Sequence, residues 1–306
     1  DQQLGQFRSK ELAHLVAMYR PRLVLVDHTP QGKHKELVQA VSAEGSSDTL
    51  WILGVRGVVG AVQQSGSEFA VNLFKNHYHA VLWYGDSSVL GTSHCDQLLQ
   101  QYNSVPVECG YVLRLAESAL WHDRLPGPDE PVAGTVAVPW LGENSIIFLT
   151  TLAAVLKKIP QSYGHWRLFV DTKSASGAGK IIKGIFDKVP NCRLEPPGNN
   201  YVSALLHSRI AIIYGGYNSL MDVVYAKIPA LVVLREMQDE EQQVHLLKLQ
   251  EVAGDSISTV SETEVSAEEL EGLLRAHLQR NNRPTSVSLN INGAACAAEY
   301  IRSLLA

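Results

Sequence analysis

The feature that most constrains this fold is a repeated alternation of helix-like and strand-like segments. Residues 8–19 carry apolar side chains at helical spacing, and an apolar run at 23–26 follows them directly. The same order recurs through residues 33–43, 49–55, 67–76, 79–84, 94–102 and 105–109. Because a helix joins each strand to the next, the strands run parallel within one sheet. The sequence therefore predicts an α/β fold with a parallel sheet.

A proline-rich segment at residues 125–133 interrupts this alternation. Its prolines remove backbone donors and fix φ, which stops a helix or a central strand. The alternation then restarts with strands expected at 134–139, 166–171, 209–214 and 229–234, and helices at 144–158, 177–187, 218–226, 239–251, 266–279 and 293–304. We expect two Rossmann-like domains, at 1–125 and 134–306. The amino-terminal domain is the short or truncated one, because it contains fewer strand–helix units.

The net charge argues against nucleic acid as a partner, and the cysteine pattern indicates the redox compartment. Lys and Arg total 26 against 31 Asp and Glu, a net charge of -5, so no basic stripe is available to neutralise a nucleic-acid backbone. The cysteines, Cys95, Cys109, Cys192 and Cys296, include no C-x-x-C pair, which is typical of free thiols in a reducing compartment. No apolar run approaches the ~20 residues that a transmembrane helix needs. These patterns favour a cytoplasmic protein without nucleic acid, transmembrane segment or targeting signal.

The most informative motif is Gly215-Gly216-Tyr217-Asn218-Ser219, which follows the expected strand 209–214. Ligands of open α/β sheets bind at the carboxyl ends of strands, where helix amino termini present unpaired N–H groups and partial positive charge. Glycines let the backbone approach a diphosphate closely. The alternative is a tight strand-to-helix turn with Asn218 or Ser219 as a simple N-cap.

Asp222 lies on the same helical face as Ser219, three residues further along. A carboxylate at this position can accept hydrogen bonds from both hydroxyls of a ribose. The alternative is a negative charge near the helix start that complements the helix dipole.

A second polar group follows the expected strand 229–234. Asp239 is a candidate N-cap, Gln242 and Gln243 fall in the first turn of the next helix, and Glu241 beside them is a further candidate for ligand binding. An amide both donates and accepts, which suits sugar hydroxyls. For Glu236 and Glu240 the alternative is an ordinary solvated acidic helix start.

Together these two segments resemble the donor-binding signature of family 28-type glycosyltransferases with the GT-B fold, close to the peptidoglycan N-acetylglucosaminyltransferases. The resemblance covers about residues 200 to 250. It implies that the glycine turn binds donor phosphate, that Asp222 holds the ribose and that Gln242 contacts the sugar. It also implies that the first domain holds the acceptor and the second the nucleotide-sugar donor.

Weaker similarity lies upstream, in segments that end strands of the amino-terminal domain. His28 follows such a strand, where a general base for an acceptor hydroxyl would be needed, although a structural or capping role is equally open. Arg56 could meet phosphate, or form a surface salt bridge. The chain departs from the family in two loops: the acceptor loop rich in glycine is absent, and the loop with the candidate ligand-binding residues Gly142 and Asn144 has one glycine.

Several segments resemble known phosphate-binding or metal-binding motifs but lack residues that these motifs require. The string at 174–180 has Ser where a P-loop requires its first Gly, and Ile181 replaces the Ser or Thr that would bind magnesium. His77, His79 and His94 lack partners at zinc-site spacing. No D-x-D pair is present for a divalent metal. We therefore expect no metal site and no cofactor, and helix amides rather than a metal stabilise the leaving diphosphate.

The sequence as a whole predicts a metal-independent glycosyltransferase. Its donor is expected to be a nucleotide diphosphate sugar, with a UDP-hexosamine implied by the resemblance, and its acceptor an unknown hydroxyl or amine. Two alternatives remain: a nucleotide-sugar hydrolase or epimerase on the same scaffold, and a non-catalytic donor-binding subunit. The latter would need a partner chain or upstream segment to complete the acceptor domain.

Overall fold

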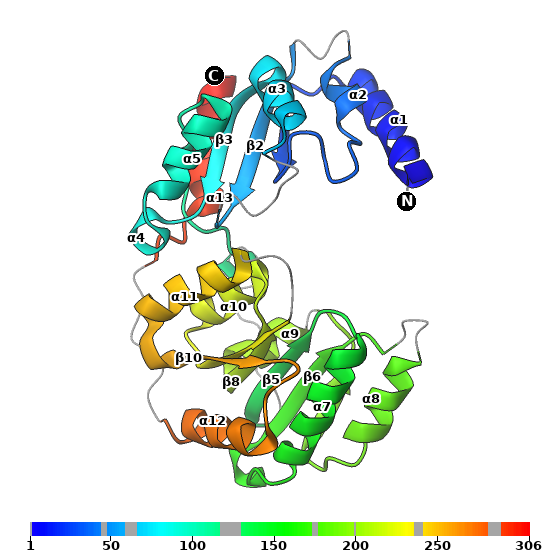
Figure 1. Cartoon of the computed structure of the whole chain (residues 1–306), viewed down its shortest axis with the longest axis vertical. Coiled ribbons are helices and arrows are strands. Elements are labelled where there is room, and N and C mark those ends of the chain that lie inside the picture. Colours follow the sequence, from blue (N-terminus) through cyan, green and yellow to red (C-terminus); the bar gives the residue numbers. More distant parts are fainter. Residues whose placement is uncertain are drawn as a thin grey trace. The chain divides into compact units, whose positions relative to one another are not determined.

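The computed structural model describes residues 2–43, 48–58, 66–116, 130–172, 177–198, 200–235, 241–280 and 289–306, with the backbone alone at 2–3 and 241–244. The chain forms two compact units, each an α/β structure (Figure 1). Unit 1 comprises Asp1–Val112, Asp239–His245 and Leu289–Ala306, and unit 2 comprises Leu113–Gln238 and Leu246–Ser288. Most of the proline-rich segment lies outside the described residues.

Unit 1 is built on a parallel sheet of four strands in the order β1-β2-β3-β4. The strands are β1 (Leu23–Asp27), β2 (Leu50–Arg56), β3 (Tyr78–Tyr84) and β4 (Val107–Glu108), and the helices are α1 (Gln2–Tyr19), α2 (Val38–Val41), α3 (Glu68–His77), α4 (Ser87–Leu90), α5 (Ser93–Tyr102) and α13 (Gly293–Leu305). The helix expected at 33–43 is shortened to α2. Lys35 has a left-handed backbone with φ 61°, which a right-handed helix does not accommodate.

The last helix, α13, packs on the sheet of unit 1 rather than on that of unit 2 (Figure 1). Ala297 is buried with Ile52, Leu82 and Cys109 in one apolar cluster. Backbone hydrogen bonds secure the return of the chain: Tyr111 donates to the Asn290 carbonyl over 2.7 Å and Gly293 donates to that of Tyr111 over 3.1 Å. The observed units therefore differ from the domains expected at 1–125 and 134–306, because apolar burial returns residues 289–306 to the first sheet.

Unit 2 has a parallel six-stranded sheet in the order β10-β9-β8-β5-β6-β7. Its elements are β5 (Val132–Val138), α7 (Glu143–Leu156), β6 (His165–Val170), α8 (Ala178–Phe186), β7 (Cys192–Glu195), α9 (Asn200–His207), β8 (Ser208–Tyr214), α10 (Tyr217–Ala226), β9 (Ala230–Leu234), β10 (Ile257–Ser261) and α12 (Ala267–Gln279), with short 3-10 turns at Gln161–Tyr163 and Gly254–Ser256. Helix α11 (Glu241–Ala253) contributes residues to both units.

The strand order of unit 2 reverses at β5. From β5 the chain moves to β6 and β7 on one side, and then returns to add β8, β9 and β10 on the other. This is the order of a doubly wound nucleotide-binding sheet, in which ligands bind at the carboxyl ends of the two strands flanking the reversal. The fold therefore directs attention to the residues that follow β5 and β8.

The central strands of this sheet are buried on both faces, which is why they read as continuous apolar runs. In β8, Ile210, Ala211, Ile212 and Ile213 are all buried. None of the helices in the described part of the chain is both long enough and apolar enough to cross a membrane.

One buried histidine predicts an acid-sensitive core in unit 2. His277 of α12 is 3% exposed, and its Nε2 lies 2.9 Å from Oγ of Ser258 on β10. Burial, and after it the positive charge of Arg280, lowers the pKa of His277 to about 4. The unfolded chain, with a pKa near 6.5, therefore binds this proton first. The stability that this histidine contributes is complete above about pH 6.5 and is lost as the pH falls toward 4.

We expect the free energy of unfolding to fall by about 2 kcal/mol more in the wild type than in His277→Gln when the pH changes from 7.5 to 5. Glutamine keeps a polar group near Ser258 and does not titrate. Denaturant unfolding of both proteins at the two pH values measures the difference. Equal losses of stability would show that His277 is not the acid-sensitive group.

Candidate functional site

A cavity of about 420 Å³ lies at the carboxyl edge of the unit 2 sheet. Strand ends form part of its wall, through Ala137 and Val138 at the end of β5, Pro139 just after it and Phe169 of β6, and Ser219 contributes from α10. The volume falls in the range of pockets that hold small ligands. The cavity is thus found where the reversal of strand order places a ligand.

The glycine turn between β8 and α10 leaves the start of α10 without a side-chain cap. Gly216 is the N-cap residue, in extended conformation, and α10 begins at Tyr217. Asn218 and Ser219 therefore lie inside the helix, and the alternative that either is the N-cap is wrong. The first amides of a helix have no intrahelical partner. A Cβ added at Gly216 would meet none of the described atoms within 4 Å, so no described side chain fills the space beside this residue.

Asp222 is buried one turn further along α10, with 2% of its side chain exposed. It accepts a hydrogen bond from Nη2 of Arg114, with which it forms an ion pair. Burial raises the pKa of Asp222 above its usual range, while Arg114 and the nearby Tyr201 hydroxyl act in the opposite direction. The carboxylate proposed from the sequence as a ribose acceptor is therefore already engaged by an arginine.

Tyr201 and Arg114 bring polar groups into the same cavity. Both line it, and the Arg114 guanidinium lies over the Tyr201 ring, 5.6 Å from its centroid. Among the described residues, the buried Tyr201 hydroxyl has no hydrogen-bond partner of ordinary geometry. Burial raises the pKa of this phenol, and the charge of Asp222 adds to the effect. A protonated donor thus lies beside the Asp222 carboxylate.

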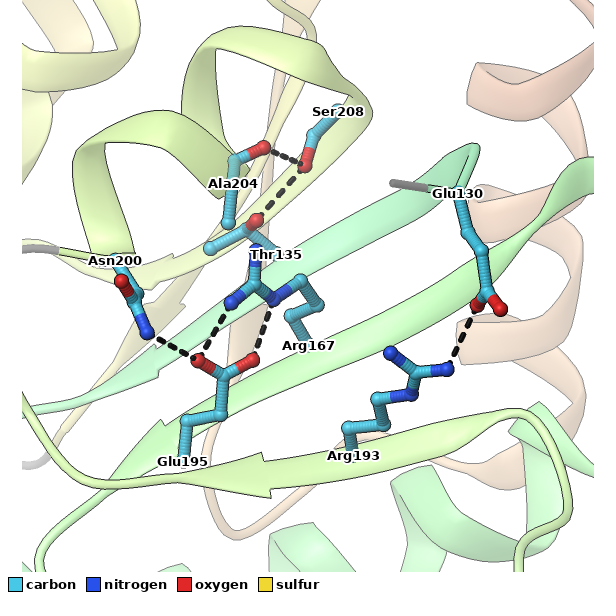
Figure 2. A network of polar contacts seen from close by, with 8 residues as sticks. All are labelled: Glu130, Thr135, Arg167, Arg193, Glu195, Asn200, Ala204 and Ser208. Atoms are coloured by element: carbon cyan, nitrogen blue, oxygen red, sulfur yellow. Dashed lines mark hydrogen bonds and ion pairs between the residues drawn. The ribbon is translucent and has the colours of Figure 1, made fainter. Parts of the chain in front are cut away.

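A network of polar contacts fixes the helix that carries Tyr201 (Figure 2). Arg167 of β6 pairs with Glu195 at the end of β7, through both its Nε and Nη2. The amide of Asn200, the first residue of α9, donates to the same carboxylate over 3.4 Å. At the other end of α9, the Ser208 hydroxyl donates to the Ala204 carbonyl over 2.8 Å. These contacts hold α9 at both ends.

A second buried network holds the start of α7. Arg235, which follows β9, lies between the rings of Trp140 and Tyr214, at 4.3 and 4.1 Å from their centroids. It pairs with Glu262 and donates to Oγ of Ser145 over 3.0 Å. This arrangement locks the ends of β8 and β9 to the loop that follows β5.

The two candidates in that loop, Gly142 and Asn144, lie at the amino end of α7. Gly142 is its N-cap, and its N–H donates to Oγ of Ser145 over 3.1 Å. Asn144 is exposed in the first turn. Both follow β5, so they belong to the same edge of the sheet as the cavity.

His28 and Arg56 follow neighbouring strands of unit 1. His28 comes directly after β1 in a left-handed conformation with φ 73°, and its backbone N–H donates to the Gly54 carbonyl over 2.7 Å. Arg56, at the end of β2, donates from Nε to Oδ1 of Asp27 over 3.1 Å, and its Nη2 contacts the other oxygen. The salt bridge considered for Arg56 is therefore present, with Asp27 as the partner.

The remaining candidates fall at the start of α11. Asp239 lies outside the described residues. Glu241 and Gln242 form the beginning of α11, and their side chains are not among those described. Their contact with a sugar stays a prediction.

Sequence reasoning missed two cavity residues, Arg114 and Tyr201. The helix that carries Tyr201 has a signal: a Pro-Pro-Gly segment precedes apolar residues at Tyr201, Ala204 and Leu205, which have helical spacing. Arg114 has none, because its partner Asp222 lies 108 residues away in the sequence.

Comparison with solved structures identifies the architecture. S. aureus MnaA in complex with UDP aligns with a TM-score of 0.69 at 11% identity, over 99% of this chain and 81% of that one. A UDP-N-acetylglucosamine 2-epimerase aligns at 0.63 and 12% identity, over 98% and 76%. The calicheamicin glycosyltransferase CalG4 aligns at 0.56 and 12% identity, over 99% and 80%.

The chain has the GT-B fold. The α/β architecture with parallel sheets expected from the sequence is confirmed, and so is the GT-B type that the resemblance implied. No family model and no curated protein matches the chain. The similarity in fold extends across almost the whole chain. At sequence identities of 11 to 14%, it establishes the fold and does not establish the reaction.

Proposed function

We propose that this GT-B chain is an enzyme that uses a nucleotide diphosphate sugar, with UDP as its nucleotide. The observation that carries the proposal is the cavity of about 420 Å³ beside the uncapped start of α10. Helix amino termini are favourable sites for phosphate, because unpaired N–H groups and the helix dipole act together. Solved structures with the same fold include one with UDP bound, which supports the choice of nucleotide.

The reaction we propose is transfer of the sugar to an acceptor hydroxyl or amine. The acceptor atom forms a bond to the anomeric carbon while the bond from that carbon to the diphosphate breaks. The negative charge that develops on the diphosphate falls next to the first-turn amides of α10, which stabilise it. His28 is the proposed base for the acceptor proton, and Gln242 the proposed sugar contact. Arg56, held by Asp27, is the second proposed catalytic side chain.

Epimerisation of the same donor is the second candidate. A UDP-N-acetylglucosamine 2-epimerase aligns with a TM-score of 0.63, against 0.56 for CalG4. Incubation with UDP-N-acetylglucosamine and no acceptor separates the two reactions. Formation of an epimer, or of free sugar by hydrolysis, would favour this candidate. Turnover that requires an added acceptor would favour transfer.

We expect UDP to raise the melting temperature of the chain more than ADP, GDP, CDP or TDP. A ligand at 100 times its dissociation constant adds about 2.7 kcal/mol to stability, which corresponds to roughly 5–10 °C for a unit of this size. Differential scanning fluorimetry with each nucleotide, with and without EDTA, measures the shift. The shift should be unchanged by EDTA. If no nucleotide stabilises the chain, the proposed function is wrong.

A further inference from the structure

The Asp222 carboxylate has its partner on the wall of the cavity rather than in the core. Asp222 is 2% exposed, whereas the side chain of Arg114 is 59% exposed and lines the cavity. The guanidinium pairs with this carboxylate and also lies over the Tyr201 ring. A ribose can therefore reach Asp222 only after Arg114 has moved.

The hydrogen-bonding groups balance when Arg114 leaves. A carboxylate accepts hydrogen bonds and donates none, whereas each ribose hydroxyl donates one. Two ribose hydroxyls can thus replace the Nη2 donor of Arg114 on Asp222, and the Tyr201 hydroxyl remains as a further donor beside the site. The carboxylate therefore has hydrogen-bond donors both before and after the exchange.

A diphosphate bound in the same cavity would offer the displaced guanidinium a second acceptor. Ser219 of the first turn of α10 lines the cavity together with Arg114. At a rise of 1.5 Å per residue, the first-turn amides lie roughly 5 to 8 Å along the helix axis from Asp222. A diphosphate on these amides offers paired oxygens, which match the planar fork of a guanidinium.

We infer that Arg114 exchanges partners when nucleotide binds: it releases Asp222 to the ribose and pairs with the diphosphate. This inference rests on the proposed function, since it requires a nucleoside diphosphate in the cavity. Arg114 is then a nucleotide-binding residue that distinguishes UDP from uridine. In the free protein it competes with the ribose for Asp222, and in the complex it contributes only when phosphate is present.

The test measures the affinities of UDP and uridine by titration calorimetry for the wild type, Arg114→Met and Arg114→Gln. We expect Arg114→Met to weaken UDP binding at least tenfold and to leave uridine binding unchanged or tighter. Arg114→Gln should behave in the same way, because it keeps a donor for Asp222 and loses the charge that pairs with phosphate.

Arg193→Met is the matched control. Arg193 is also an exposed arginine of unit 2 paired with a carboxylate, that of Glu130, and it does not line the cavity. It should bind both ligands as the wild type does. If Arg114→Met fails to fold because Asp222 is left buried without its partner, the double variant Arg114→Met with Asp222→Asn removes that charge, and is compared with Asp222→Asn alone.

Each outcome separates the inference from the proposed function. The exchange of partners would be overturned if Arg114→Met changed the affinities for UDP and uridine equally, or changed neither. UDP binding by the wild type would still support the proposed function. Absence of UDP binding to the wild type would remove both. A lower affinity for UDP, with the affinity for uridine unchanged or higher, would establish Arg114 as the residue that binds the phosphate.

Discussion

Replacing Gly216 by valine abolishes nucleotide binding and leaves the fold intact: this is the largest effect we expect from a single substitution. A Cβ at Gly216 meets no atom of the described residues within 4 Å, and Gly216 has an extended backbone that valine also adopts. The added methyl groups would instead occupy the space next to the first-turn amides of α10. A diphosphate seated there would be excluded.

Titration with UDP, together with circular dichroism, measures both halves of this expectation. Gly216→Ala should show a smaller loss of affinity, since it adds one methyl group. Gly272→Val is the control: it lies in α12, where an added Cβ also meets open space. Retained UDP affinity in Gly216→Val would show that the phosphate binds elsewhere.

Asp222→Ala should weaken the binding of UDP and uridine alike, by tenfold to a hundredfold. Hydrogen bonds to a charged group are typically worth about 1.5 to 3 kcal/mol, and both ligands contain the ribose. Asn at this position should restore part of the affinity, because it keeps one acceptor oxygen. Arg114, being mostly exposed, would remain solvated after the change, so we expect a stability loss of about 1 kcal/mol or less.

Melting temperature and affinity together decide between the two roles of Asp222. The structural role to be tested is the ion pair with Arg114, since the carboxylate does more than complement the helix dipole. A lower melting temperature with unchanged affinity for both ligands would leave only the structural role.

The central strands of unit 2 could be predicted closely from the sequence. A strand was expected at 209–214 and β8 spans Ser208–Tyr214, and a helix was expected at 218–226 and α10 spans Tyr217–Ala226. Both faces of a central parallel strand are covered by helices, so almost every residue of the strand is apolar and the strand can be recognised as an apolar run in the sequence. The glycine turn between them is equally local, which is why the start of α10 could be located.

The outer strands of the same sheet were missed. β7 contains Arg193 and Glu195, and β10 reads Ile-Ser-Thr-Val-Ser, so neither presents an apolar run. Each lies at an edge of the sheet, where one side has no neighbouring strand and polar side chains are tolerated. The sequence analysis also missed helix α9, which follows β7, and therefore missed Tyr201, which lies on α9.

The pairing of distant residues could not be read from a single sequence either. Arg114 and Asp222 approach each other because separate elements meet at one edge of the sheet, and no local pattern encodes that meeting. The same holds for α13, whose amphipathic pattern shows that it covers an apolar surface and does not say which one.

The position of α13 affects the order in which the protein is completed during synthesis. Domains generally fold from the amino terminus as the ribosome releases them. Here the residues that close the apolar cluster of unit 1, Ala297 among them, are synthesised after all the strands of unit 2. While unit 2 is being synthesised, the sheet of unit 1 lacks α13, and the apolar residues that α13 covers stay exposed. Unit 1 therefore receives its helix α13 only after the described strands of unit 2 have been made.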